Sequence, residues 1–129
     1  MSCADSIAKM LADAHFTNCF TKVGPSALDC EEPIVVLDGA FERESRQVEE
    51  ERGTVVVAVM VVREVMADAE SVALAAELAV RMGSWEPYAV AGPYRIVGVD
   101  TTAPALKERD GSGRFVWSFE AACTVVRST

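Results

Sequence analysis

The amino-acid sequence predicts an α+β fold, with an antiparallel or mixed β-sheet, two helices packed on one side of it, and the element order α-β-β-α-β-β. Three observations support this prediction. Two segments place apolar residues at helical spacing, and four segments have the β-branched or alternating pattern of strands. The strands also come in consecutive pairs, which join most simply as antiparallel hairpins and leave the helices to gather on one face.

The first predicted helix lies at the start of the chain. Ile7, Met10, Leu11 and Ala14 fall on one helical stripe, and Ser2 stands three residues before Asp5, as in a capping box. After this helix, Gly24-Pro25 and Pro33 indicate a loop that contains a short extended piece.

The second predicted helix is capped by Asp68, runs to about Met82 and stops at Gly83. Its small side chains would let it lie close to the sheet. The inner face is predicted to consist of Val72, Ala75, Ala76, Ala79 and Met82.

The first two predicted strands are Ile34 to Leu37 and Thr54 to Val62, and the second of these is almost continuously apolar and β-branched. The segment between them, "ERESRQVEEER" from Glu42 to Arg52, is rich in charge. We interpret it as the tip of a long hairpin that projects as a charged arm, and the alternative is a solvated loop.

The last two predicted strands are Tyr94 to Asp100 and a final strand that begins at Phe115. In the first of these, Tyr94, Ile96 and Gly98 alternate with Arg95, Val97 and Val99. The final strand alternates more clearly, and its predicted core face consists of Phe115, Trp117, Phe119, Ala121, Cys123 and Val125.

The "DGSG" stretch between these strands supplies the glycines that a chain reversal needs. The loop before it exposes Lys107, Glu108, Arg109 and Asp110. These residues suit a polar contact with a neighbouring protein, or they serve only to keep the surface soluble.

The composition of the chain limits the kinds of function that we expect. A chain of 129 residues with 50% hydrophobic content predicts a single domain over residues 1–129. The net charge of -8 disfavours nucleic-acid binding and anionic membranes, and the absence of a signal-like or spanning segment predicts a soluble, cytoplasmic chain. The four cysteines form no close pair and the chain has one histidine, so we expect reduced thiols and no zinc site.

Catalysis is not indicated by any motif. His15 and Cys19 would meet only if the first helix continued through both residues, and the paired carboxylates lie in polar runs where solvent keeps their pKa values ordinary. We therefore predict no enzyme activity, no metal and no cofactor. The alternative is a small ligand-binding domain or enzyme that uses an aromatic pocket around Trp85, Tyr88 and Tyr94, although such a group more often packs under a loop.

The C-terminal third resembles a known family. A short strand ending in an acidic residue, a proline-containing loop, a turn with aspartate, glycine and arginine, and an aromatic final strand recur in the tail-terminator and related minor capsid, or head-tail joining, proteins of long-tailed, non-contractile bacteriophages and prophages. The residues that carry the resemblance are Tyr94 to Asp100, Pro104, Asp110, Gly113, Arg114, Phe115 and Phe119.

The resemblance implies a non-enzymatic α+β subunit that forms a ring, commonly a hexamer, at the end of the tail tube. Its partners would be other copies of itself, the tail tube and the head-tail connector proteins, with DNA passing through the channel unbound and no membrane. It would lie in the host cytoplasm during assembly and then at the tail-head junction of the virion. The predicted interface residues are Glu42, Arg43, Glu44, Arg46, Glu49, Arg52, Lys107, Glu108, Arg109 and Asp110.

Overall fold

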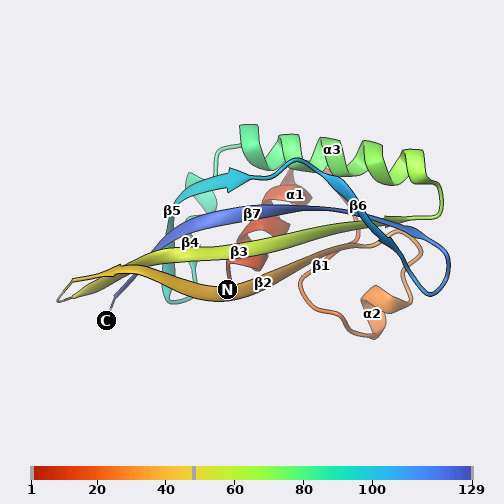
Figure 1. The fold of residues 1–129 in the computed structure, drawn as a ribbon. Coiled ribbons are helices and arrows are strands. Elements are labelled where there is room, and N and C mark those ends of the chain that lie inside the picture. The colour runs from red at the N-terminus through yellow and green to blue at the C-terminus, as the bar shows by residue number, and fades with distance from the viewer. Residues whose placement is uncertain (1, 48, 129) are drawn as a thin grey trace.

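A computed structural model describes residues 2–47 and 49–128 of the chain. The elements follow one another as α1 (Cys3–Asp13), β1 (Cys19–Phe20), α2 (Pro25–Leu28), β2 (Ile34–Arg46), β3 (Glu50–Arg63), α3 (Met66–Met82), the 3-10 helix η1 (Glu86–Tyr88), β4 (Val90–Ala91), β5 (Tyr94–Thr101), β6 (Ala105–Arg109) and β7 (Phe115–Ser128). Figure 1 shows these elements as a long twisted sheet with α3 lying along it. The predicted α+β class is confirmed.

The sheet has the order β1-β2-β3-β7-β5-β4, and β6 also pairs with β7. All of its pairs are antiparallel except the short β1–β2 pair. The centre is the β3–β7 pair, which runs without a break from Glu50–Ser128 to Arg63–Phe115. The other edge of β7 is shared, because β6 covers Phe115 to Ser118 and β5 covers Ala121 to Arg127.

The core lies between one face of the sheet and the helices α1 and α3. Alternate residues of β3 are buried there, and Ala69, Ala73 and Ala76 let α3 approach closely. The predicted core face of β7 is confirmed in its middle and C-terminal part, where Phe119 is only 1% exposed. Phe115 and Trp117 are half-buried because they lie toward the end of the sheet.

The start of the chain forms the predicted helix. In α1 the Ser2 side chain accepts a hydrogen bond from the Asp5 amide, and the Asp5 carboxylate accepts one from the Ser2 amide, which completes the capping box. The carboxylate of Asp38 on β2 also accepts from the Ala4 amide at 2.9 Å, so the sheet helps to fix this helix end. Ala14 is the C-cap and is exposed.

The predicted start and inner face of α3 are wrong in part. The helix begins at Met66, and its N-cap is Val65 rather than Asp68, which lies in the first turn. The buried residues are Ala69, Ala73, Ala76, Glu77 and Val80, whereas the predicted inner residues Ala75 and Met82 are exposed. The outer side of α3 is also apolar, so hydrophobic periodicity could not identify which side faces the sheet.

The predicted order α-β-β-α-β-β is too short. The structure adds β1, α2, β4 and β6. Helix α2, which brings the number of α-helices to three, lies in a segment predicted as loop. Strand β6 lies in the charged stretch that was also predicted as loop. Every residue of β6 is exposed, so no buried apolar face marked it as a strand, yet its backbone pairs with β7. The alternation of β5 breaks at Val97, where a register shift places Gly98 opposite Thr124 and turns Val99 to the core side with Cys123.

The charged segment after Ile34 to Leu37 is an arm rather than a loop. Strands β2 and β3 stay paired as far as Arg46 and Glu51, and Figure 1 shows their tip extending beyond the other elements at one end of the sheet, beside the C-terminus. The predicted arm includes Val48, which lies outside the described residues. No described helix is long and apolar enough to cross a membrane.

Candidate interaction surfaces

The two segments predicted to contact other proteins lie at opposite ends of β7. The arm pairs with Ser128 at one end, and the turn between β6 and β7 precedes Phe115 at the other. A strand of 14 residues is roughly 45 Å long at about 3.3 Å per residue. The arm and the turn therefore cannot form one site on one subunit.

The arm is organised around a carboxylate that the sequence did not single out. Glu51 is buried. Its carboxylate oxygens form ion pairs with three arginines, with nitrogen–oxygen distances of 2.5 Å to Arg127, 3.5 Å to Arg43 and 3.6 Å to Arg46. The hydrogen bond from Arg127, assisted by the charges of all three arginines and opposed by burial, lowers the pKa of Glu51. The carboxylate therefore stays ionised and connects the three arginines.

Arg127 is held by aromatic rings as well as by Glu51. Its guanidinium lies 4.5 Å from the centre of the Phe41 ring and 5.7 Å from that of Tyr94, and these two rings stack at 5.4 Å. The residues come from β2, β5 and β7. This layer fastens the base of the arm to the body of the sheet.

The arm residues therefore divide into two groups. Arg43 and Arg46 form ion pairs within the chain, and the Glu44 carboxylate accepts a hydrogen bond from Thr54 Oγ1. Glu42, Glu49 and Arg52 are exposed and form no ion pair with another described residue. The charges of this second group are available for a partner, unlike those of Arg43 and Arg46.

We expect Glu51→Gln to lower the folding stability at pH 7 and to lower it less in acid. Because the pKa of Glu51 is lowered in the folded chain, its stabilising effect is present above the unfolded value of about 4.3 and is lost as the pH falls through the folded value. Urea midpoints of both proteins at pH 7 and pH 3 would test this. A difference between the two proteins that grew toward pH 3 would contradict it.

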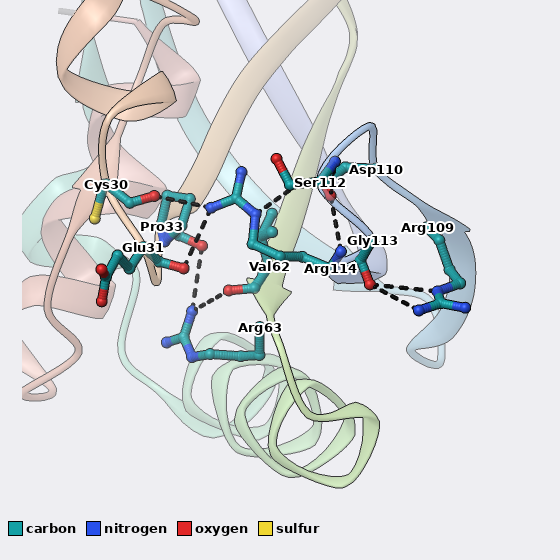
Figure 2. A network of polar contacts seen from close by, with 10 residues as sticks. All are labelled: Cys30, Glu31, Pro33, Val62, Arg63, Arg109, Asp110, Ser112, Gly113 and Arg114. Carbon is teal, nitrogen blue, oxygen red and sulfur yellow. Dashed lines mark hydrogen bonds and ion pairs between the residues drawn. The ribbon is translucent and has the colours of Figure 1, made fainter.

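The turn between β6 and β7 is built by Asp110. Figure 2 shows the Asp110 carboxylate accepting hydrogen bonds from the amides of Ser112 and Arg114, while Arg114 Nε donates to it at 2.7 Å. Gly113 has φ +83°, a backbone conformation that favours glycine. Burial opposes the ionisation of Asp110, but these hydrogen bonds outweigh it and lower the pKa. The predicted reversal at "DGSGR" is confirmed, but of its two glycines only Gly113 has the expected positive φ, and the prediction of a positive φ at Gly111 is wrong.

Arg114 also connects this turn to a distant part of the chain. Its Nη1 donates to the carbonyls of Cys30 and Glu31, at 2.9 and 3.2 Å (Figure 2). Next to it, Arg63 Nη1 donates to the carbonyls of Val62 and Pro33, at 2.8 and 3.3 Å. The two arginines hold the segment after α2 against the end of the sheet.

Most of the predicted interface residues near the turn make contacts within the chain. The Arg109 guanidinium lies 4.7 Å from the centre of the Phe115 ring and donates a hydrogen bond to the Gly113 carbonyl. Asp110 forms an ion pair with Arg114. Lys107 Nζ lies 3.5 Å from the Met60 sulfur. Glu108 is exposed and has no ion pair among residues 2–47 and 49–128.

Tyr88 and Tyr94, two residues of the predicted aromatic pocket, have different partners in the described part of the chain. Tyr94 belongs to the Arg127 layer, while the Tyr88 hydroxyl donates to the Asp13 carboxylate. A cavity of about 300 Å³ lies next to Tyr88, between α1 and the end of α3, but neither Trp85 nor Tyr94 lines it. The three aromatic side chains pack separately against the core.

The conditions for a His15–Cys19 dyad are not met. Helix α1 ends at Asp13, His15 has φ 73°, and Cys19 lies in β1, so the two residues do not share a helix. Burial raises the pKa of Cys19. All four cysteines are free thiols, and the described part of the chain contains no group of three metal-ligating side chains.

Comparison with known proteins finds a similarity in fold. No family model matches the chain, and no curated protein matches it. A chain in the structure of the virion of a native gene transfer agent particle superposes with a TM-score of 0.66 at 15% identity, over 97% of this chain and 95% of that one. The two chains share a fold.

Proposed function

We propose that this chain is a non-enzymatic structural subunit of a phage-like virion, in the tail-terminator or head-tail joining class, that assembles as a ring at the end of the tail tube. The observation that carries the proposal is the fold shared, over nearly the full length of both chains, with a chain of a gene transfer agent virion. The resemblance of Tyr94 to Phe119 to the terminator family supports the same class independently of that superposition.

The charges of the chain suit this role. A net charge of -8 works against binding of the phosphate backbone, so DNA could move through a ring without adhering to it. The exposed charges of the arm, Glu42, Glu49 and Arg52, would contact a neighbouring subunit or the tube. The subunit would assemble in the host cytoplasm and remain in the virion at the tail-head junction.

Light-scattering mass on a sizing column, with negative-stain images, tests the ring. We expect closed particles of uniform mass, formed more readily as protein concentration rises and altered by salt. A chain that stayed monomeric up to about 1 mM, the concentration at which even a contact of 4 kcal/mol is half formed, would contradict the proposed self-assembly.

Charge reversal on the arm gives a sharper prediction. We expect Glu42→Lys combined with Glu49→Lys to weaken assembly in low salt and to leave the unfolding curve nearly unchanged, because both side chains are exposed and make no ion pair with a described residue. Asp29→Lys, an exposed charge reversal beside α2 and far from the arm, is the control and should assemble normally. Equal weakening by both would argue against an arm contact.

A further inference from the structure

The arm has two sides, because successive residues of a strand point to opposite faces of a sheet. Arg46 and Arg127 lie directly opposite Glu51 on the two neighbouring strands, so they share its side. Arg43 lies opposite Gly53, two residues after Glu51, and its guanidinium also reaches the Glu51 carboxylate. We define the basic side of the arm as these three arginines together with Glu51.

The other side of the arm carries mostly carboxylates. Positions 50, 52 and 54 of β3 alternate with Glu51 and therefore face the opposite way. Glu42 lies opposite Thr54, and the Glu44 carboxylate accepts a hydrogen bond from the Thr54 hydroxyl, so both glutamates belong to this side. Arg95 of β5 faces the same way, but β7 separates it from β3. We define the acidic side of the arm as four exposed residues, Glu42, Glu44, Glu50 and Arg52.

The two sides of the arm have net charges of equal size and opposite sign. Three guanidinium groups and one carboxylate leave the basic side with an excess of two positive charges, because Glu51 balances only one of its three arginines. Three carboxylates and one guanidinium leave the acidic side with an excess of two negative charges. Arg43 and Arg46 lie 3.5 and 3.6 Å from Glu51, longer than a typical hydrogen bond, so their N–H groups suit a further carboxylate.

Both sides of the arm are accessible to another protein. Figure 1 shows that α1 and α3 lie over the body of the sheet and that the arm extends beyond them. The side chains of Arg43 and Arg46 are 55% and 61% exposed. Arg127 is fixed between Glu51 and the Phe41 ring, so the basic side is held in place before a partner arrives and its binding costs less conformational entropy.

We infer that the basic side of the arm of one subunit packs against the acidic side of the arm of the next. This inference rests on the proposed ring and names the surfaces that form it. The charges favour a second copy of the chain as the occupant, because one arm presents an excess of two positive charges on one side and of two negative charges on the other. Such a contact joins two different surfaces, so each added subunit leaves one of each kind free until the chain of contacts closes.

Reversing the charge of one side at a time tests the inference. Glu42→Lys with Glu50→Lys makes both sides of the arm basic, and Arg43→Glu with Arg46→Glu makes both sides acidic. Like charges then face each other between identical subunits, so we expect each double variant alone to be monomeric in light scattering at low salt. An equimolar mixture restores opposite charges at every contact and should assemble again, with the two variants alternating.

Several results would overturn the inference. If either double variant assembled alone as readily as the wild-type chain, or if the mixture stayed monomeric while the wild-type chain assembled, the contact between arms would be wrong and the proposed ring would stand. A wild-type chain that never assembled would remove both. Melting curves check the fold, because Arg43→Glu with Arg46→Glu leaves Glu51 with Arg127 alone. If that variant is unfolded, Arg43→Gln with Arg46→Gln replaces it and should weaken assembly at least several-fold; assembly at the wild-type level would contradict the inference.

A matched control separates the arm from the net charge of the chain. Lys9→Glu with Lys22→Glu also turns two cations into two anions, at exposed positions outside the arm, and should assemble like the wild-type chain. Equal loss of assembly in this control would mean that net charge, rather than the arm, governs the contact.

DNA phosphates are the other anions that a group of arginines suits. We therefore measure binding of a DNA duplex to the wild-type chain and to Arg43→Gln with Arg46→Gln, and expect no difference between them. A duplex that bound only the wild-type chain, together with normal assembly of the variant, would assign the basic side to DNA and overturn the inference.

Discussion

Replacing Phe119 by alanine is expected to lower the free energy of unfolding by about 3–5 kcal/mol, the usual cost of removing a buried phenylalanine side chain. Phe119 is 1% exposed and lies opposite Val59 in the middle of the central strand pair. The helices and strands around it are joined in one continuous core, so they cannot close the space without moving a whole element. For a chain whose total stability is about 5–15 kcal/mol, the variant would be marginal.

Urea unfolding of Phe119→Ala beside Glu120→Ala measures this effect. Glu120 is the next residue of β7, lies on the opposite side of the sheet from Phe119 and is exposed, so its replacement should change the stability by less than about 0.5 kcal/mol. Equal midpoints for the two variants would mean that the faces of β7 are reversed.

The faces of β7 could be predicted from sequence because its two sets of side chains differ in chemistry. Phe119, Cys123 and Val125 alternate with Ser118, Glu120 and Thr124, and a period of two has only one interpretation there. Helix α3 offers no such contrast, because Leu74 and Leu78 on its outside are more hydrophobic than the alanines that it buries. The wrong inner face and the exposure of Leu74 and Leu78 thus have the same origin.

The interaction surfaces were predictable only in part. The charge of the arm and the "DGSGR" turn are visible in the sequence because their residues are neighbours in the chain. The Arg127–Glu51 pair joins residues 76 positions apart, and Arg114 reaches Cys30 across 84 positions. A single sequence contains no signal for such pairs. Arg43 and Arg46 are near Glu51 in the chain, but their ion pairs with it depend on the register of the hairpin, which shifts after Arg43 and which a run of charges does not determine.

Replacing Arg114 by alanine is the second change with a large expected effect, a loss of roughly 2–3 kcal/mol. Arg114 is 19% exposed and donates to the Asp110 carboxylate and to the carbonyls of Cys30 and Glu31. Without it, a partly buried carboxylate and two carbonyl groups lose their donor together. Lysine should restore less than half of the loss, since one ammonium cannot reproduce the fork of a guanidinium.

Arg109→Ala supplies the matched control for this prediction. It removes an arginine from the same turn, but Arg109 is exposed and contacts only Phe115 and the Gly113 carbonyl, so it should cost less than about 1 kcal/mol. Trypsin cleavage after Lys22, which lies in the segment between β1 and α2, gives an independent readout. Cleavage should accelerate in Arg114→Ala and not in Arg109→Ala, because Arg114, unlike Arg109, helps to hold the segment after α2 against the sheet. If both variants were cleaved at the wild-type rate, Arg63 alone would be sufficient to hold that segment in place.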